Sequence, residues 1–337
     1  MEREIDMKQK NEAETAQQTD PKVPAGDGID RRNFLECMAW AGTGLVWSLV
    51  AGVPTSKLLA DTATSAKKKV VEDFSFVQIS DSHIGFNKAA NQNVTGTLKI
   101  AIDKINAGRA GMKQPEFMIH TGDITQSSKP VEFDTAEQVI RGASVGQVFY
   151  VPGEHDFSLD DGEQYKQRFA KGTLGNGWYS HDYKGVHFVG LNNCVQVDAM
   201  GNLGADQLAW LKADLGGLSA SMPVVLFAHI PLWMVYEKWG WGTQDGATAL
   251  SYLKRFGSVT VLNGHIHQVV QKVEGNVTFH TAMSTAFPQP APGSAPGPGP
   301  MAVPAGKLES VLGVTNVKVV RGHNQLAVVD SPLAETV

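Results

Sequence analysis

Histidine and acidic side chains gather along this sequence in five short clusters, each in a pattern suited to metal binding. The clusters are Asp81-Ser82-His83, Gly122-Asp123, Gly153-Glu154-His155-Asp156, His229 and Gly264-His265-Ile266-His267. They supply three aspartates, one glutamate and five histidines, a donor set that suits Fe, Mn or Zn. Because carboxylates gathered without partners would repel one another and be costly to bury, bound cations are the expected partners.

Taken singly, most of these clusters have an ordinary structural explanation. An isolated Asp-x-His or Gly-Asp is commonly a surface turn, and an isolated residue such as His229 more often satisfies a hydrogen bond in a core. Gly264-His265-Ile266-His267 is more specific, because alternate residues of an extended segment point the same way. All five clusters in this order favour a metal centre over five unrelated turns.

Each cluster follows a short apolar run that predicts a buried strand. The runs are Phe74–Ile79, Glu116–Ile119, Val148–Val151, Val224–Phe227 and Val259–Leu262. Helical spacing of apolar residues over Val94–Ile105 and Val131–Ile140 separates the first three runs. Strands that alternate with helices in this way bring their carboxyl ends, and therefore the clusters, to one edge of a sheet.

The later part of the chain predicts hairpins, one further helix and a long loop. The hairpins pair Trp178–Tyr183 with Val186–Leu191, Val269–Val273 with Val277–Thr281, and Val314–Val320 with Leu326–Val329. Gly204–Leu215 predicts a helix, and the proline- and glycine-rich Phe287–Gly306 predicts a long loop that either covers the site or only connects elements.

The ordered clusters resemble the calcineurin-like metallophosphoesterases, from about Phe74 to at least His280. The resemblance implies an α/β (α+β) fold, a four-layer αββα sandwich of two mixed β-sheets flanked by helices. It also implies two divalent or trivalent metal ions. The first would be held by Asp81, His83, Asp123 and His267, and the second by Asp123, Glu154, His229 and His265. Asp123 would bridge the ions, since a carboxylate has two oxygens to share.

The same resemblance implies hydrolysis of a small phosphomonoester or phosphodiester by a hydroxide that bridges the metals. His155 would donate a proton or a hydrogen bond to the leaving or non-bridging oxygen, and Asp156 would orient that imidazole. Gln126 stands where purple acid phosphatases carry a tyrosine ligand, so a ferric tyrosinate site is not expected. Compact bacterial cyclic-nucleotide phosphodiesterase-like members look most similar.

One residue departs from the family's pattern, because Glu154 stands where the family usually has asparagine. A charged ligand should hold a metal ion more tightly and weaken its Lewis acidity. Two hypotheses therefore stand: a metal-dependent phosphohydrolase, and a non-catalytic metal-binding protein of the cell envelope with the same fold.

The N-terminal part predicts export. Residues 1–29 are polar and predict a disordered extension. Arg31-Arg32 before the apolar stretch Cys37–Val53 is typical of a twin-arginine signal, although a short buried helix with a basic flank is the alternative. We therefore interpret residues 30–69 as signal and linker and residues 70–337 as the metallophosphoesterase domain.

The export interpretation sets the expected partners and location. The chain would meet the twin-arginine export machinery and work in the periplasm or another extracytoplasmic space. Because an apolar stretch of about 17 residues is marginal for a bilayer span, membrane contact is expected only in transit or through an uncleaved signal.

Composition narrows the remaining functions. The net charge of −5 provides no basic surplus to displace phosphate counterions, which counts against nucleic-acid binding. With Cys37 in the signal, Cys194 has no intrachain disulfide partner and is expected to be a small buried residue. The aromatic residues that follow His229 predict either a rim for a substrate or ordinary packing. They are Trp233, Tyr236, Trp239 and Trp241.

Overall fold

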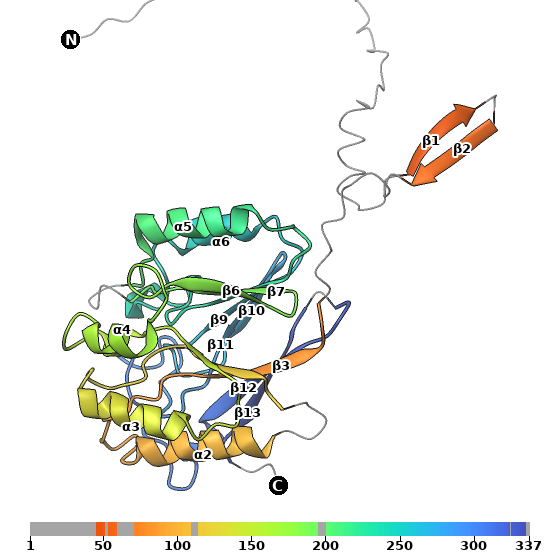
Figure 1. The fold of residues 1–337 in the computed structure, drawn as a ribbon. Coiled ribbons are helices and arrows are strands. Elements are labelled where there is room, and N and C mark those ends of the chain that lie inside the picture. Colours follow the sequence, from red (N-terminus) through yellow and green to blue (C-terminus); the bar gives the residue numbers. More distant parts are fainter. Residues whose placement is uncertain are drawn as a thin grey trace, which may run out of the picture. The chain divides into compact units, whose positions relative to one another are not determined.

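The computed structural model describes residues 45–50, 53–58, 71–108, 114–194, 200–323 and 325–334 of the 337-residue chain. The chain forms two units, Met1–Lys68 and Lys69–Val337 (Figure 1). In the first unit, β1 (Leu45–Val50) pairs with β2 (Val53–Leu58) as an antiparallel hairpin. Arg31, Arg32 and the extension over residues 1–29 lie outside the described residues, so the export signal remains a prediction.

Two β-sheets form the second unit. The five-stranded sheet has the order β13-β12-β3-β4-β5, and the six-stranded sheet has the order β10-β11-β9-β8-β7-β6. The first sheet contains β3 (Phe74–Ile79), β4 (Phe117–His120), β5 (Val148–Tyr150), β12 (Gly313–Val319) and β13 (Ala327–Pro332). The second contains β6 (Tyr179–Tyr183), β7 (Val186–Gly190), β8 (Val224–Phe227), β9 (Val259–Asn263), β10 (Gln271–Glu274) and β11 (Val277–Thr281).

Both sheets are mixed. Strands β3, β4 and β5 are parallel, whereas β12 runs antiparallel to β3 and to β13. In the other sheet β7, β8, β9 and β11 are parallel, and the antiparallel β6 and β10 lie at its edges. The acidic and histidine clusters all follow parallel strands, namely β3, β4 and β5 of the first sheet and β8 and β9 of the second.

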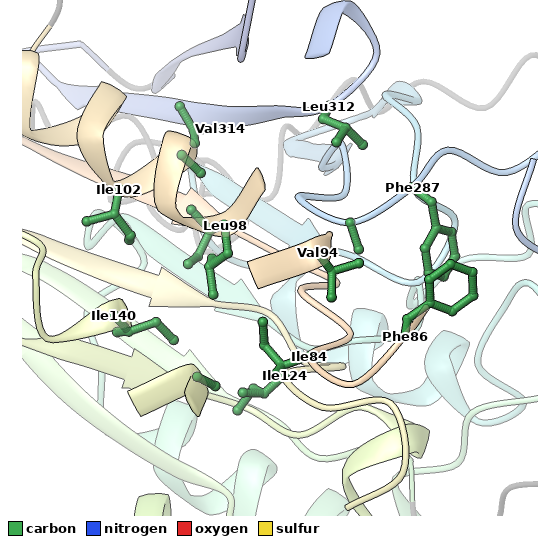
Figure 2. Close-up of a cluster of buried hydrophobic side chains, with 14 of the residues drawn as sticks. Ile84, Phe86, Val94, Leu98, Ile102, Ile124, Ile140, Phe287, Leu312 and Val314 are labelled. Atoms are coloured by element: carbon green, nitrogen blue, oxygen red, sulfur yellow. The ribbon is translucent and has the colours of Figure 1, made fainter. Parts of the chain in front are cut away.

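Helices cover the outer face of each sheet. The helices are α2 (Val94–Ala107), α3 (Pro130–Ile140), α4 (Glu163–Phe169), α5 (Gly204–Gly216) and α6 (Gly246–Leu253). Leu98 and Ile102 of α2 pack toward the five-stranded sheet beside Val314 (Figure 2). Leu211 of α5 and Leu253 of α6 pack on the six-stranded sheet. The predicted four-layer αββα sandwich is confirmed (Figure 1).

Aromatic side chains fill the space between the two sheets. The rings of Phe76 and Phe117 stack at 4.9 Å, and Phe188 of the other sheet meets Phe76 edge-on at 5.5 Å. Such pairs add about 0.5–1.5 kcal/mol each beyond the area they bury. This contact fixes how the two sheets face each other, and therefore how their strand ends meet.

The strands and helices predicted from the sequence are confirmed with ends within one or two residues, except that β13 ends three residues later than predicted. Strands β1 and β2 and helices α4 and α6 are additional. Residues 282–307 contain no helix or strand, as the long-loop prediction requires. Cys194 is buried as expected. Among the described residues, no helix combines the length and the apolar composition that crossing a bilayer requires.

Candidate metal centre

The five clusters converge at the carboxyl ends of parallel strands from both sheets. In the five-stranded sheet, the loop after β3 carries Asp81 and His83, the loop after β4 carries Asp123, and the loop after β5 carries Glu154. In the six-stranded sheet, the loop after β8 carries His229, and the loop after β9 carries His265 and His267. Their ligand atoms form overlapping groups in which all atoms lie within 4.8 Å of one another. The structure thus brings together every side chain predicted to bind metal.

The first group is built from Asp81, His83 and His267. Nε2 of His267 lies 3.2 Å from Oδ1 of Asp81 and 3.2 Å from Nε2 of His83. Nε2 of His83 also lies 3.4 Å from Oδ2 of Asp123. Ligand atoms about 2.1 Å from one metal ion stand about 3.0–3.4 Å apart, so these spacings suit a shared ion.

The second group is built from Glu154, His229 and His265. One carboxylate oxygen of Glu154 lies 3.0 Å from Nε2 of His229, and the other lies 2.9 Å from Nδ1 of His265. Nε2 of His229 is 3.4 Å from Oδ2 of Asp123. Oδ2 of Asp123 therefore stands at the same distance from one histidine of each group, as a shared ligand would.

The hydrogen bonds of the rings support this fit. Nδ1 of His229 donates to the carbonyl of Thr121 at 2.7 Å, and Nδ1 of His267 donates to the carbonyl of Phe287 at 2.6 Å. Because a carbonyl only accepts, each Nε2 is left to face the centre. Nε2 of His229 and Oε2 of Glu154 are buried and lie 3.0 Å apart but are not aligned for a hydrogen bond, a state that bound metal would relieve.

The backbone at the centre is unusual. Asp81, His83, Asp123, His265 and His267 all have positive φ, between 41° and 70°. Non-glycine residues adopt this region rarely and at a cost, and such residues cluster at functional sites. The strand-end turns thus aim the side chains inward at the expense of local strain.

Two glycines permit the close approach of the ligand loops. A Cβ at Gly264 would stand 2.0 Å from Oγ of Ser80 and 2.6 Å from Oδ2 of Asp81. A Cβ at Gly153 would stand 2.0 Å from Oδ1 of Asp123. No other residue fits either position without moving a ligand carboxylate.

Electrostatics divide the ligands into charged and neutral groups. Burial favours the protonated form of Asp81, but His267, His229 and His83 outweigh it and hold its pKa below the usual range. Burial lowers the pKa of His83 to about 3 despite the attraction of Asp123, so this imidazole is neutral and able to ligate. Burial opposes charge on His229, but Asp123 and Glu154 raise its pKa well above the ordinary value. A metal ion would replace that proton.

His155 stands beside the first group of ligands. Its ring meets the His83 ring edge-on at 4.8 Å, and its backbone N–H donates to Oδ1 of Asp123 at 3.0 Å. Its Nδ1 donates to the carbonyl of Gln126 at 2.8 Å, which leaves Nε2 for another partner. Burial opposes protonation of the ring, but Asp123 and Glu154 outweigh it and raise the pKa of His155.

The prediction that Asp156 orients His155 is wrong. The Asp156 carboxylate instead accepts hydrogen bonds from the backbone N–H groups of Gly153, Ile124 and Thr125, at 2.9–3.1 Å. Residues 154–156 form one 3₁₀ turn, in which successive side chains diverge. Burial and the charge of Asp123 raise the pKa of Asp156 to about 7. Asp156 therefore ties the Asp123 and Glu154 loops together.

Gln126 is the contact that sequence reasoning missed. The sequence showed only that this position lacks a tyrosine. Its backbone carbonyl orients the His155 ring, and its side-chain nitrogen lies 3.2 Å from Nδ1 of that ring. Every residue has a backbone carbonyl, so the residue type at position 126 does not reveal this contact. The only clue in the sequence is that Gln126 lies three residues after Asp123.

The long loop begins against the metal centre. The Phe287 ring packs 4.8 Å from the His83 ring and 4.7 Å from the His267 ring. Gln289 donates from Nε2 to the carbonyl of His265 at 3.1 Å. The start of this loop therefore supports ligand residues as well as connecting β11 to β12.

The aromatic residues after β8 differ in how deeply they are buried. Trp233 and Trp241 are buried, and Trp233 packs on Phe279 at 4.7 Å, so both are packing residues. Tyr236 and Trp239 remain half-exposed and meet edge-on at 5.2 Å. A role for these two as a rim for a substrate stays a prediction.

A family model for the calcineurin-like phosphoesterases matches residues 74–269, which carry every ligand described above. The chain belongs to the calcineurin-like phosphoesterase family. Within this family its centre keeps the expected donors at every position except 154, where glutamate replaces asparagine.

Three relatives are similar in sequence to this calcineurin-like phosphoesterase. It is 25% identical over 226 residues to the glycerophosphodiester phosphodiesterase GpdQ of Enterobacter lignolyticus, covering 63% of this chain and 77% of that protein. It is 23% identical over 220 residues to a probable GpdQ of Arcobacter nitrofigilis, covering 62% and 77%. A probable cyclic nucleotide phosphodiesterase of Vesicomyosocius okutanii subsp. Calyptogena okutanii is 23% identical over 219 residues, covering 64% and 87%.

Solved structures share the fold of this phosphoesterase. A dimetal phosphatase from Danio rerio superposes with a TM-score of 0.55 at 17% identity, covering 76% of this chain and 98% of the other. A purple acid phosphatase from yellow lupin superposes at 0.54 with 12% identity, covering 79% and 52%. At these identities the likeness establishes the architecture.

Proposed function

We propose that this calcineurin-like phosphoesterase hydrolyses a small phosphomonoester or phosphodiester with two metal ions, of Fe, Mn or Zn. The observation that carries the proposal is Asp123, whose Oδ2 lies 3.4 Å from Nε2 of both His83 and His229. The seven clustered Asp, Glu and His side chains would hold the two ions, which would supply Lewis-acid activation of the phosphoryl group and of water near neutral pH. The similarity to relatives named as phosphodiesterases supports the same reaction class.

The protein's own residues position the substrate and handle protons. Gln126 holds the His155 ring by Nδ1, so Nε2 is the atom that would donate to the leaving or non-bridging oxygen. Asp123 and Glu154 favour the protonated ring, which is the form that can donate. Asp156 contributes indirectly, because it fixes the loops that carry Asp123 and Glu154.

Hydrolysis of p-nitrophenyl phosphate and bis-p-nitrophenyl phosphate with Mn, Zn or Fe tests the proposal. We expect Asp123→Asn to lower kcat/KM at least about a thousandfold, because both metal sites lose a charged ligand. Asp103→Asn, on the exposed side of α2, is the matched control and should keep full activity. An active Asp123→Asn protein would refute the shared-ligand mechanism.

Glu154 favours a second candidate, a metal-binding envelope protein without turnover. A third carboxylate neutralises more of the metal charge and so weakens activation of water. The comparison of wild type with Glu154→Asn decides between the two. Turnover that appears only in Glu154→Asn supports the second candidate, and turnover in the wild type supports the first.

Export by the twin-arginine route is part of the proposal. The pair Arg31-Arg32 before an apolar stretch supports it, and this route carries folded proteins, so metal could be loaded before export. Replacing both arginines with lysine should retain the protein in the cytoplasm when cell fractions are compared by immunoblotting. Continued export of that variant would contradict this interpretation.

A further inference from the structure

The seven ligand side chains differ in how far they reach solvent. Asp81 and His229 are 0% exposed, and the side chains of Asp123, His83 and His267 are 1–3% exposed. The side chain of Glu154 is 18% exposed, and that of His265 is 15% exposed. The mouth of the centre is therefore formed by Glu154 and His265, which contact each other at 2.9 Å.

Glu154 is thus the one carboxylate of the centre that an incoming anion would meet. Asp81 and Asp123 are buried and shielded from solvent. The two oxygens of Glu154 lie 3.0 Å from Nε2 of His229 and 2.9 Å from Nδ1 of His265, so the two rings confine the carboxylate. With asparagine at this position the same surface would be neutral.

The charge of the centre follows from its donors. Asp81, Asp123 and Glu154 contribute three negative charges, and neutral histidines contribute none. Asparagine at position 154 would leave two. Whatever metal ions are bound, the loaded centre carries one positive charge less in this protein than in a relative with asparagine.

We propose that Glu154 makes the centre select monoanionic phosphodiesters over dianionic phosphomonoesters. This inference rests on the proposed function and specifies its substrate class. A diester carries one negative charge, whereas a monoester above its second pKa of about 6 carries two. Each added charge on the substrate is repelled by a fixed carboxylate at the mouth, and because that side chain is only 18% exposed, solvent screens the repulsion less than in bulk water. One unit of charge at this range changes relative affinity about tenfold.

A matched pair of ligands tests the inference without turnover. Phenylphosphonate is a dianion at pH 8.5, and its monomethyl ester is a monoanion of nearly the same shape. Calorimetry on protein loaded with saturating Mn²⁺ gives the ratio of their affinities. We expect Glu154→Gln to raise the affinity for phenylphosphonate about tenfold relative to the methyl ester.

Three further variants make the outcome specific. Glu154→Asp keeps the charge and should keep the wild-type ratio. Glu274→Gln removes one charge from the exposed strand β10, outside the ligand set, and should leave the ratio unchanged. Glu154→Asn carries the residue that the family accepts here and should reproduce Glu154→Gln, which guards against misfolding of one variant.

The outcomes separate this inference from the proposed function. If both anions bind the loaded wild type but the ratio in Glu154→Gln and Glu154→Asn stays within twofold of it, selection by Glu154 is refuted. An equal change in Glu274→Gln would refute it as well. If neither anion binds the metal-loaded wild type, the phosphoesterase proposal itself fails. A raised dianion preference without turnover supports the inference while counting against catalysis.

Discussion

Single residues set the metal centre through the second nitrogen of each imidazole. Nδ1 of His229, His267 and His155 is bound to a backbone carbonyl at 2.6–2.8 Å. Each such bond selects one tautomer and one ring orientation before metal arrives. The free energy needed to orient these rings, and to hold the ligand residues at positive φ, is therefore supplied by folding.

Gly264→Ala tests this close packing. The new methyl group would displace Asp81, so we expect the Kd for the first metal ion to rise at least about tenfold. Gly216→Ala is the control, because a Cβ there meets nothing within 4 Å. Metal titration by calorimetry gives both values, and an unchanged Kd in Gly264→Ala would show that the loop adapts.

His181 predicts a loss of stability in acid. Its ring is stacked between Phe149 at 4.1 Å and Phe188 at 5.2 Å, and both ring nitrogens are buried without partners. Burial and nearby His187 lower its pKa to about 4. In the unfolded chain the pKa of a histidine is near 6.5, so between about pH 6.5 and 4 the unfolded state binds more protons than the folded state. The free energy of unfolding therefore falls as the pH drops through that window.

His181→Phe should remove this acid sensitivity. We expect its free energy of unfolding, relative to wild type, to rise by about 1–2 kcal/mol between pH 7 and 4, discounted for partial exposure. His187→Gln should show the opposite trend. Burial opposes charge on His187, but Asp214 and Asp182 raise its pKa, so its stabilising charge is present below about pH 6.5. Urea unfolding at several pH values measures both, and parallel curves would contradict the assignment.

Sequence reasoning reached the residue types of the centre but not their contacts. Asp-x-His and Gly-His-x-His identify metal ligands because the residue type alone determines whether a side chain can bind a metal ion. The carbonyl of Gln126 and the four hydrogen bonds of Asp156 depend on where distant backbone groups come to lie. Neighbouring positions in sequence suggested a contact between Asp156 and His155, and the 3₁₀ turn separates them.

At the scale of elements, the loop after β8 is coupled to the start of α5. Helix α5 begins at Gly204 after the N-cap residue Leu203, which has no side-chain oxygen to cap it. Asp245 serves instead, accepting from the N–H of Leu203 at 3.0 Å and of Gly204 at 2.9 Å. The carboxylate also suits the positive end of the helix dipole.

Asp245→Ala should therefore destabilise the protein by about 1–2 kcal/mol, the usual cost of losing a cap. Asp206→Ala removes an exposed carboxylate from the first turn of the same helix. This change should lower the free energy of unfolding by less than about 0.5 kcal/mol. Thermal unfolding of both variants measures the difference. Equal losses would show that charge near the helix start matters and the capping bonds do not.

The elements that the sequence predicted are those with a strong apolar pattern. Strand β8 is fully buried and is a continuous apolar run, and β3 is fully buried and mostly apolar, interrupted by Ser75 and Gln78. Helix α4 is short and mostly polar, with Tyr165 as its buried residue, so periodicity is absent. Helix α6 follows a loop rich in glycine and aromatic residues, and its eight residues are too few to show a face.

Across the whole molecule, polar contacts join the two sheets near the centre. Gln78 of β3 donates to Thr121 at 2.9 Å and to the carbonyl of Asn263 at 3.1 Å. His280 of β11 lies 3.0 Å from a carboxylate oxygen of Asp330 on β13. A metal ion held by the candidate ligands would add to this link, because Asp81 and Asp123 come from one sheet and His229 and His267 from the other.

Metal binding should consequently stabilise the folded domain as one unit. A ligand at about 100 times its Kd adds about 2.7 kcal/mol, which corresponds to a rise in Tm of roughly 5–10 °C for a domain of this size. We expect calorimetric melting to show one transition that moves up with Mn²⁺ and down with EDTA. Asp123→Asn, which weakens both sites, should lose most of that shift, whereas Asp103→Asn should keep it. A second transition on metal addition, or an unmoved Tm at saturating metal, would mean that the centre does not clamp the two sheets together.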